Sequence, residues 1–167
     1  VPITDRNALL LAAGYAALYQ ETTSHVPPGD FNAPETHKKQ SGYDFLKSIE
    51  RGTTSFPPIA ALMESGPCDI EKGRVAFSGT PTDAHYTPMG TVHSGYAATL
   101  LEAGQCYTTL ELSVKYVRPL TKNAGPVTAE GRVIHLSRRL ATAEGQLMDA
   151  TGKLYAHGTL TAMVFLN

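Results

Sequence analysis

Residues 107–118 carry the pattern that most restricts the fold of this chain. Apolar and polar side chains alternate along it, and the apolar ones are Leu110, Leu112, Val114 and Tyr116. A period of two predicts a half-buried antiparallel strand, with one face on a core and the other in water. Such a strand requires a second layer that covers its apolar face.

One strand is expected before this segment and three are expected after it. The predicted strands are residues 74–79, 127–136, 140–149 and 154–165. Turn signals flank them at Lys72-Gly73, at the Ser-Arg-Arg connection of residues 137–139 and at residues 149–152. We therefore predict that residues 107–165 form four consecutive antiparallel strands, arranged as a one-layer meander.

The helix that covers this sheet is expected to begin near Ser94. The sequence passes through turn residues and then becomes an apolar run that carries one carboxylate, Glu102. Shorter helices are expected at residues 43–51 and 57–63, the second with proline in its first turn. This order of elements predicts an α+β domain with one central helix, the only long helix on which the sheet can pack.

Composition excludes several classes of function. The length of 167 residues suits one domain with a sizeable core, and the net charge of −1 without a basic run disfavours nucleic-acid binding. The histidines form no HxxxH or HExxH pair and the two cysteines have no CxxC spacing, so we expect no metal site and no cofactor. Two thiols without a disulfide framework indicate the cytoplasm.

The first 48 residues are expected to stand apart from a folded domain at residues 49–167. Residues 4–20 have the pattern of a helix, and residues 21–42 are rich in Pro, Gly and polar side chains, as an irregular linker is. The apolar run at residues 9–13 is too short for a membrane span and makes a poor signal peptide. We therefore expect no membrane association.

Three segments, in this order, resemble a known family. They are GTVHSGYAATLLE, YTTLELSVKYVRPLT and GPVTAEGRVIHLSRRLATAEGQLMDATGKLYAHGTLT. Together they resemble the hotdog-fold thioesterases of the PaaI-like group, which are relatives of 4-hydroxybenzoyl-CoA thioesterase. The resemblance covers residues 49–165 and does not extend to residues 1–48.

The resemblance implies a hotdog fold, in which an antiparallel sheet wraps around one central helix, here with extra N-terminal helices. In that family two protomers pair their sheets edge to edge, and the dimers often associate into tetramers. The activity implied is hydrolysis of an acyl-CoA thioester at the dimer interface, which yields the free acid and CoA.

The resemblance also assigns catalytic positions. The amide of Ser94, directly after His93, would polarise the thioester carbonyl, and Glu102, nine positions after the histidine, would activate water or attack directly. Thr87 falls on a position, six before the histidine, that is usually Asn or Gln. From the residues alone, His93 can equally be a helix-start residue and Glu102 an ordinary solvated acid.

Gly95, Arg138 and Arg139 are the candidate substrate-binding residues. Gly95 keeps the second glycine of the family's HGG motif, whereas Ser94 replaces the first and adds a side chain where the ligand approaches the helix. The two arginines match a turn that can meet the phosphates of CoA. Their alternative role is that of solvated charges in a hairpin.

Distance within the helix predicts that the amide and the acid belong to different chains. The eight steps from Ser94 to Glu102 span about 12 Å at ~1.5 Å per residue, too far for both groups to act on one carbonyl. A symmetric dimer would bring each acid to the other chain's helix start and produce two sites.

The short distance between Glu102 and the following strand departs from the family. Ala103-Gly104-Gln105 follow at once, so residues 93–104 would make only about 18 Å of helix, short for crossing a sheet. Either a segment is deleted here, or the chain joins the two sides of a missing segment within residues 99–104. In the second case Glu102 belongs to a loop and the true acid lies in the missing segment.

Two other classes of function remain open. A non-catalytic hotdog module that binds acyl-CoA or another small ligand is the main alternative, because Thr87 and Ser94 depart from the family pattern. A hydratase or dehydratase is the third, and it needs a histidine and a carboxylate that converge on one carbon, for which His93 is the one candidate histidine.

Overall fold

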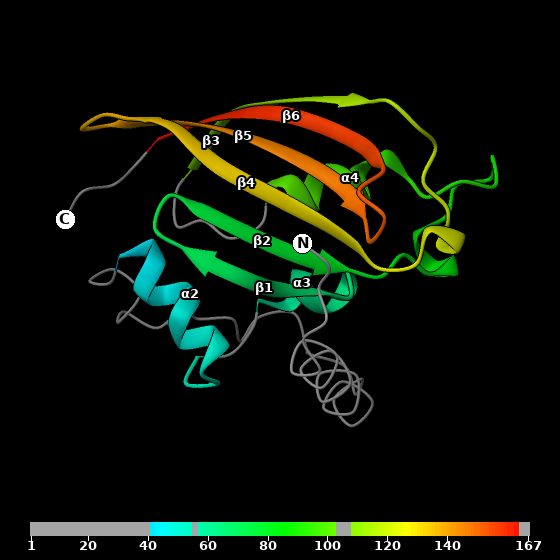
Figure 1. Ribbon diagram of the computed structural model, residues 1–167, viewed down its shortest axis with the longest axis horizontal. Coiled ribbons are helices and arrows are strands. Elements are labelled where there is room, and N and C mark those ends of the chain that lie inside the picture. Colours follow the sequence, from blue (N-terminus) through cyan, green and yellow to red (C-terminus); the bar gives the residue numbers. More distant parts are fainter. Residues whose placement is uncertain (1–40, 55–56, 103–107, 164–167) are drawn as a thin grey trace. The chain divides into compact units, whose positions relative to one another are not determined.

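The computed structural model describes residues 41–54, 57–102 and 108–163 (Figure 1). The helix predicted at residues 4–20, almost all of the linker predicted at residues 21–42, and Cys106 lie outside these residues. None of the described helices has the length and apolar character needed to cross a lipid bilayer.

Six antiparallel strands form one sheet. They are β1 (Ser65–Glu71), β2 (Arg74–Gly79), β3 (Thr108–Tyr116), β4 (Val127–Leu136), β5 (Leu140–Asp149) and β6 (Leu154–Met163). This sheet and its covering helix confirm the predicted α+β class and the five predicted strands. The sixth, β1, was not predicted, because Pro67 and the irregularity between Pro67 and Asp69 interrupt its alternation.

The strand order is β1-β2-β4-β5-β6-β3, so the predicted four-strand meander was wrong for β3. Only β4, β5 and β6 follow one another. The place beside β4 is taken by β2, which pairs Phe77 with Ala129, and β3 pairs instead with β6, where Leu112 faces Leu160. On the predicted apolar face of β3, Leu112 and Val114 are half-buried, whereas Leu110 and Tyr116 are exposed. The alternation carried no information about the neighbour of the strand.

The helix α4 (Ser94–Glu102) packs on the concave face of this sheet, beneath the curved strands β4, β5 and β6 (Figure 1). It buries Tyr96, Ala97 and Leu100, which lie on one side of the helix because positions i, i+1 and i+4 share a face. The buried residues that they meet come from the sheet and the loop after β3: Leu120, Val127, Ala129, Leu147 and Ala156. This cluster fixes the position of α4.

Tyr96 approaches β2 unusually closely. A Cβ atom at Gly79 would lie 2.5 Å from the Tyr96 hydroxyl, so glycine is what lets the ring enter. The ring is 3% exposed, packs 4.6 Å from the His85 ring and has no hydrogen-bond partner for its hydroxyl among the described residues. Burial raises the pKa of this phenol well above its ordinary value, so it remains neutral.

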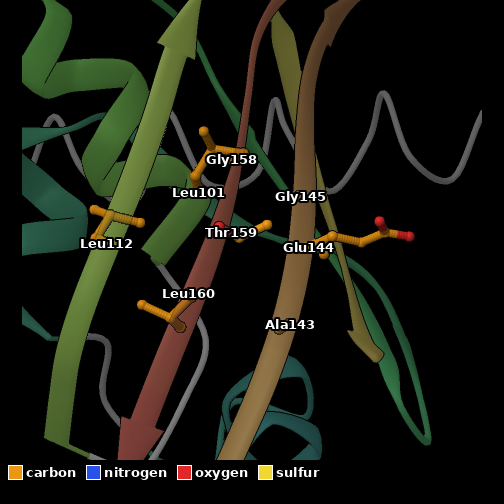
Figure 2. Close-up of a pocket in the computed structure, with 9 residues that line it drawn as sticks. Leu101, Leu112, Ala143, Glu144, Gly145, Gly158, Thr159 and Leu160 are labelled. Atoms are coloured by element: carbon orange, nitrogen blue, oxygen red, sulfur yellow. The ribbon is translucent and has the colours of Figure 1, made fainter. Parts of the chain in front are cut away.

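Leu101, on the next side of α4, lies over glycines in the middle of the sheet (Figure 2). Gly145 on β5 pairs with Gly158 on β6, and a Cβ atom at Gly145 would lie 3.0 Å from Leu101 Cδ2. The end of α4 therefore sits close to the strands. The Glu144 side chain, beside Gly145, points away from the helix (Figure 2).

A second helix of the same length also packs on the sheet. The helix α2 (Gly42–Glu50), predicted at residues 43–51, buries Leu46 in a cluster with Ile70 and Phe77. The short helix α3 (Pro58–Leu62) lies where residues 57–63 were predicted to be helical. The expectation that α4 is the only long helix on the sheet was therefore wrong. The sequence predicted the helix α2 but did not show that it packs on the sheet.

We predict that Gly79→Ala lowers the free energy of unfolding by about 1–3 kcal/mol, because the new methyl group overpacks the contact with Tyr96. Tyr96→Phe alone should cost little, since the lost hydroxyl is buried without a partner among the described residues. In the Tyr96→Phe background, Gly79→Ala should cost less than in the wild type. Urea unfolding followed by circular dichroism measures all four chains, and an equal cost in both backgrounds would contradict this packing account.

Candidate functional site

A groove of about 500 Å³ lies at the head of α4. Its walls are the loop that precedes the helix and the chain that leaves β3. Its floor is apolar and consists of side chains from five parts of the fold: Val92, Ala97, Leu120, Leu147 and Ala156. A groove of this size and character is what a small acyl or aromatic group fills.

The first free amide of α4 faces this groove. Ser94 is the first residue of the helix and lines the groove, and its N–H has no acceptor among the described residues. The next N–H, that of Gly95, donates to Nδ1 of His93 at 2.9 Å. Because the first turn of α4 contains no acidic residue, the positive end of the helix dipole is left for a ligand.

His93 therefore caps the helix. Its Nδ1 is an acceptor, so the ring proton is on Nε2 in this arrangement. A Cβ atom at residue 95 would lie 2.8 Å from His93 Nδ1, which explains why Gly95 stands there. The N–H of Gly95 is thus used within the protein, whereas that of Ser94 has no acceptor among the residues that the structure describes.

Thr87 lines the groove, but its hydroxyl is used within its own loop. It donates to the Thr91 carbonyl at 3.2 Å and accepts from the Met89 N–H at 3.2 Å, while the Thr87 N–H donates to the same carbonyl at 2.8 Å. Thr87 therefore shapes the loop wall. At the tip of this loop Met89 is 87% exposed and forms one lip of the groove.

Backbone hydrogen bonds hold the start of α4 in place. The His93 N–H donates to the His85 carbonyl at 2.8 Å, and the Val92 N–H donates to the Leu120 carbonyl at 2.9 Å. The His85 ring accepts from the Thr82 N–H at Nδ1 and contacts the Leu62 carbonyl through Nε2 at 2.9 Å. The Ser94 amide is therefore preorganised by contacts on both sides of the loop.

Glu102 is the last residue of α4 and lies away from the groove of its own chain. Its Oε1 accepts a hydrogen bond from the Thr109 hydroxyl at 2.5 Å, and both side chains are half-buried. Thr109 pairs with Ala162 at the end of β6, whereas the groove includes Ala156 at the start of that strand. Within one chain, the acid and the amide occupy opposite ends of the sheet.

Arg138 and Arg139 share the end of the sheet that holds Glu102. They lie in the connection between β4 and β5, both exposed. From Leu140, next to them, to Leu147 in the groove floor, β5 spans about 23 Å at ~3.3 Å per residue. The structure thus brings Thr87, His93 and Ser94 together at the groove. Glu102, Arg138 and Arg139 lie at the opposite end of the sheet.

The question of a missing segment concerns residues 99–104. Residues 99–102 continue α4, and Glu102 is helical rather than part of a loop. The remaining residues of the predicted junction, 103–104, lie outside the described residues.

Two residues at the site were not singled out from the sequence. Thr109 belongs to the polar face of a strand and gave no signal, because its contact with Glu102 arises where β3 passes the end of α4. Arg118, after β3, lines the groove. Among the described residues, no three His, Cys, Asp or Glu side chains lie close enough to hold a metal ion.

Comparison with known proteins gives one match to a family model. The profile of the thioesterase superfamily matches residues 89–156, a segment that includes the loop wall, α4 and most of the sheet. Comparison with curated protein sequences gives no match.

Solved structures with the same fold include several thioesterase relatives. A mutant of the phenylacetic acid degradation protein PaaI from Thermus thermophilus is 24% identical, with a TM-score of 0.61 over 65% of this chain and 100% of that one. A putative thioesterase related to phenylacetic acid degradation from Ralstonia eutropha is 25% identical, with a TM-score of 0.62 over 72% and 99%. A thioesterase mutant from Staphylococcus aureus is 19% identical, with a TM-score of 0.60 over 64% and 98%.

We predict that His93→Ala lowers the free energy of unfolding by about 1 kcal/mol, because the Gly95 N–H loses its cap. His93→Asn should recover most of this loss, since asparagine is among the best capping residues. Urea unfolding measures both, with His135→Ala, an exposed histidine on β4, as the control. If the asparagine variant is as unstable as the alanine variant, His93 does not act as a cap.

Proposed function

We propose, on the premise that this chain belongs to the thioesterase superfamily, that it hydrolyses an acyl-CoA thioester to the free acid and CoA between two copies of itself. The observation that carries the proposal is the Ser94 N–H, which lies at the positive end of α4 in an apolar groove and has no acceptor among the described residues. Such a donor suits the carbonyl oxygen of a thioester.

The Ser94 amide would stabilise the transition state. When a nucleophile adds to the thioester carbonyl, negative charge develops on the oxygen, and a fixed N–H in an apolar site lowers the energy of that charge by about 3 kcal/mol. The helix dipole adds to this effect. Because the loop hydrogen bonds already fix the amide, it does not need to reorganise during the reaction.

Glu102 would supply the base. Its carboxylate takes a proton from water, the resulting hydroxide bonds to the carbonyl carbon, and the tetrahedral oxyanion rests on the Ser94 amide. Collapse then breaks the carbon–sulfur bond, and the CoA thiolate leaves and receives the proton. The Thr109 hydroxyl holds one carboxylate oxygen, which leaves the other for water. The same residues also allow a variant in which the Glu102 carboxylate itself attacks the thioester carbonyl carbon in place of water.

A dimer is required because one chain holds the amide and the acid about 12 Å apart along α4. The two free edges of the described sheet are β1 and β3. Pro67 and an irregularity make β1 a poor pairing edge, whereas β3 has no proline and pairs regularly from Glu111 to Tyr116. We therefore assign β3 as the edge that pairs with a second copy.

Twofold pairing through β3 would complete the site. In an antiparallel pair centred near the middle of the strand, Thr109 of the partner subunit lies opposite Tyr116, which lines the groove. The partner's Glu102 is then brought toward the Ser94 amide. We also propose that the dimers associate into tetramers. A cytoplasmic location is proposed as well, because it suits the free thiol of Cys68.

A non-catalytic module that binds acyl-CoA is the second candidate, and one observation favours it. The Thr87 hydroxyl is used in its own loop, so the described wall of the groove offers no side-chain amide to orient the substrate. Such a module would still bind an acyl group on the apolar floor. Turnover separates the two candidates.

We predict that the protein releases CoA from at least one of a panel of short, medium and aryl acyl-CoAs, measured by thiol release. Glu102→Gln should lower kcat at least about a hundredfold, because the amide cannot accept the proton from water. Glu144→Gln, an exposed acid on β5 whose side chain points away from α4, is the matched control and should leave the rate unchanged. A near-normal rate for Glu102→Gln would show that the acid lies elsewhere, and absence of turnover would favour the binding module.

We also predict complementation between two inactive chains. Ser94→Pro removes the amide at a helix position that tolerates proline, and Glu102→Gln removes the acid. Co-expressed with different tags at equal amounts, they form mixed dimers with one complete site, so about a quarter of the wild-type activity should return. Each variant alone is the control. No recovery in purified mixed dimers would mean that the amide and the acid of one chain act together.

A further inference from the structure

Arg118 takes no part in the steps described above, yet it lies in the wall of the same groove. It follows β3 and is exposed. Among the described residues that line the groove, it is the only lysine or arginine, and none of them is an Asp or Glu. The ligand that fills this groove therefore meets one positive charge and no negative one from these residues.

The guanidinium of Arg118 is anchored but not neutralised. Its Nη1 donates to the Leu154 carbonyl at 2.5 Å, which fixes the direction of the planar group. No carboxylate among the described residues lies within ion-pair distance of it. Lys122, on the same connection, is different, because Asp83 holds its Nζ at 2.7 Å.

This arrangement suits an anion. A guanidinium has more N–H donors than one carbonyl can use, and the remaining donors match the paired oxygens of a phosphate or a carboxylate. An arginine with an acidic partner would lack this capacity.

We propose that Arg118 binds an anionic group of the thioester substrate, either a phosphate of its CoA part or a carboxylate at the end of its acyl group. The inference rests on the proposed function for the identity of the substrate. It assigns anion recognition to the groove of the same chain, whereas Arg138 and Arg139 lie at the opposite end of the sheet. Arg118 would thereby determine which thioesters the enzyme prefers.

The competing explanation is that Arg118 only ties the chain after β3 to β6 through Leu154. In that case Arg118→Met would affect every ligand equally, whether charged or neutral. The test must therefore compare ligands that differ only in their anionic groups. Lys72→Met, an exposed cation in the turn between β1 and β2 and outside the groove, is the matched control.

Binding is measured first, by titration calorimetry of the full chain. CoA is compared with dephospho-CoA, which lacks the 3′-phosphate, and 4′-phosphopantetheine is compared with pantetheine, which lacks its phosphate. Glutarate is compared with valerate, which lacks the second carboxylate. If Arg118 binds phosphate, Arg118→Met should weaken CoA binding by about tenfold or more and leave pantetheine unchanged. If it binds a carboxylate, the preference for glutarate over valerate should disappear. Arg118→Lys should recover part of either effect.

Kinetics provide the second readout. Glutaryl and valeryl esters of CoA and of N-acetylcysteamine separate the two sources of charge, and the loss should appear in KM for the charged member of a pair, with kcat retained. Equal losses for all ligands, or no loss for any, would overturn the assignment of Arg118. If no thioester is hydrolysed but CoA binding still depends on Arg118, the proposed reaction fails while this inference stands.

Discussion

The packing of α4 against the concave face of the sheet is the interaction on which the rest depends. Tyr96, Ala97 and Leu100 anchor the helix on the buried strands, and Gly79 and Gly145 provide the room for its close approach. A helix held in this way has a fixed first turn. The free Ser94 N–H is useful only because this core and the loop hydrogen bonds hold it at the groove.

The same helix separates the two groups that a hydrolase needs. Its N-terminal end favours negative charge and its C-terminal end carries Glu102, which Thr109 holds. The nine residues of α4 place the Ser94 amide and the Glu102 carboxylate about 12 Å apart, so both cannot reach one carbonyl within a single chain. In the proposed reaction, a single chain would hold half of a site, and a twofold axis through β3 would be the simplest operation that joins two halves.

Polar groups in the groove are distributed in a way that suits a charged ligand with an apolar portion. The floor is aliphatic, the open amide is at one end, and Arg118 has no acidic neighbour among the described residues. The His93 ring and the Thr87 hydroxyl are both used inside the protein, one as a cap and the other in a turn. Recognition thus depends on few donors, each held by backbone contacts rather than by other charged side chains.

The sequence by itself determined the strands that alternate and the position of the helix start, because these depend on local periodicity and turn residues. The limits of β2, β4 and β5 matched the predicted ranges for this reason. It also made Ser94 and Glu102 candidates for the site through their places in a motif, and their roles stay a proposal. The sequence could not determine that β3 lies beside β6 or that Thr109 contacts Glu102. Those facts depend on which segments meet across the sheet, and only the packed core decides such non-local contacts.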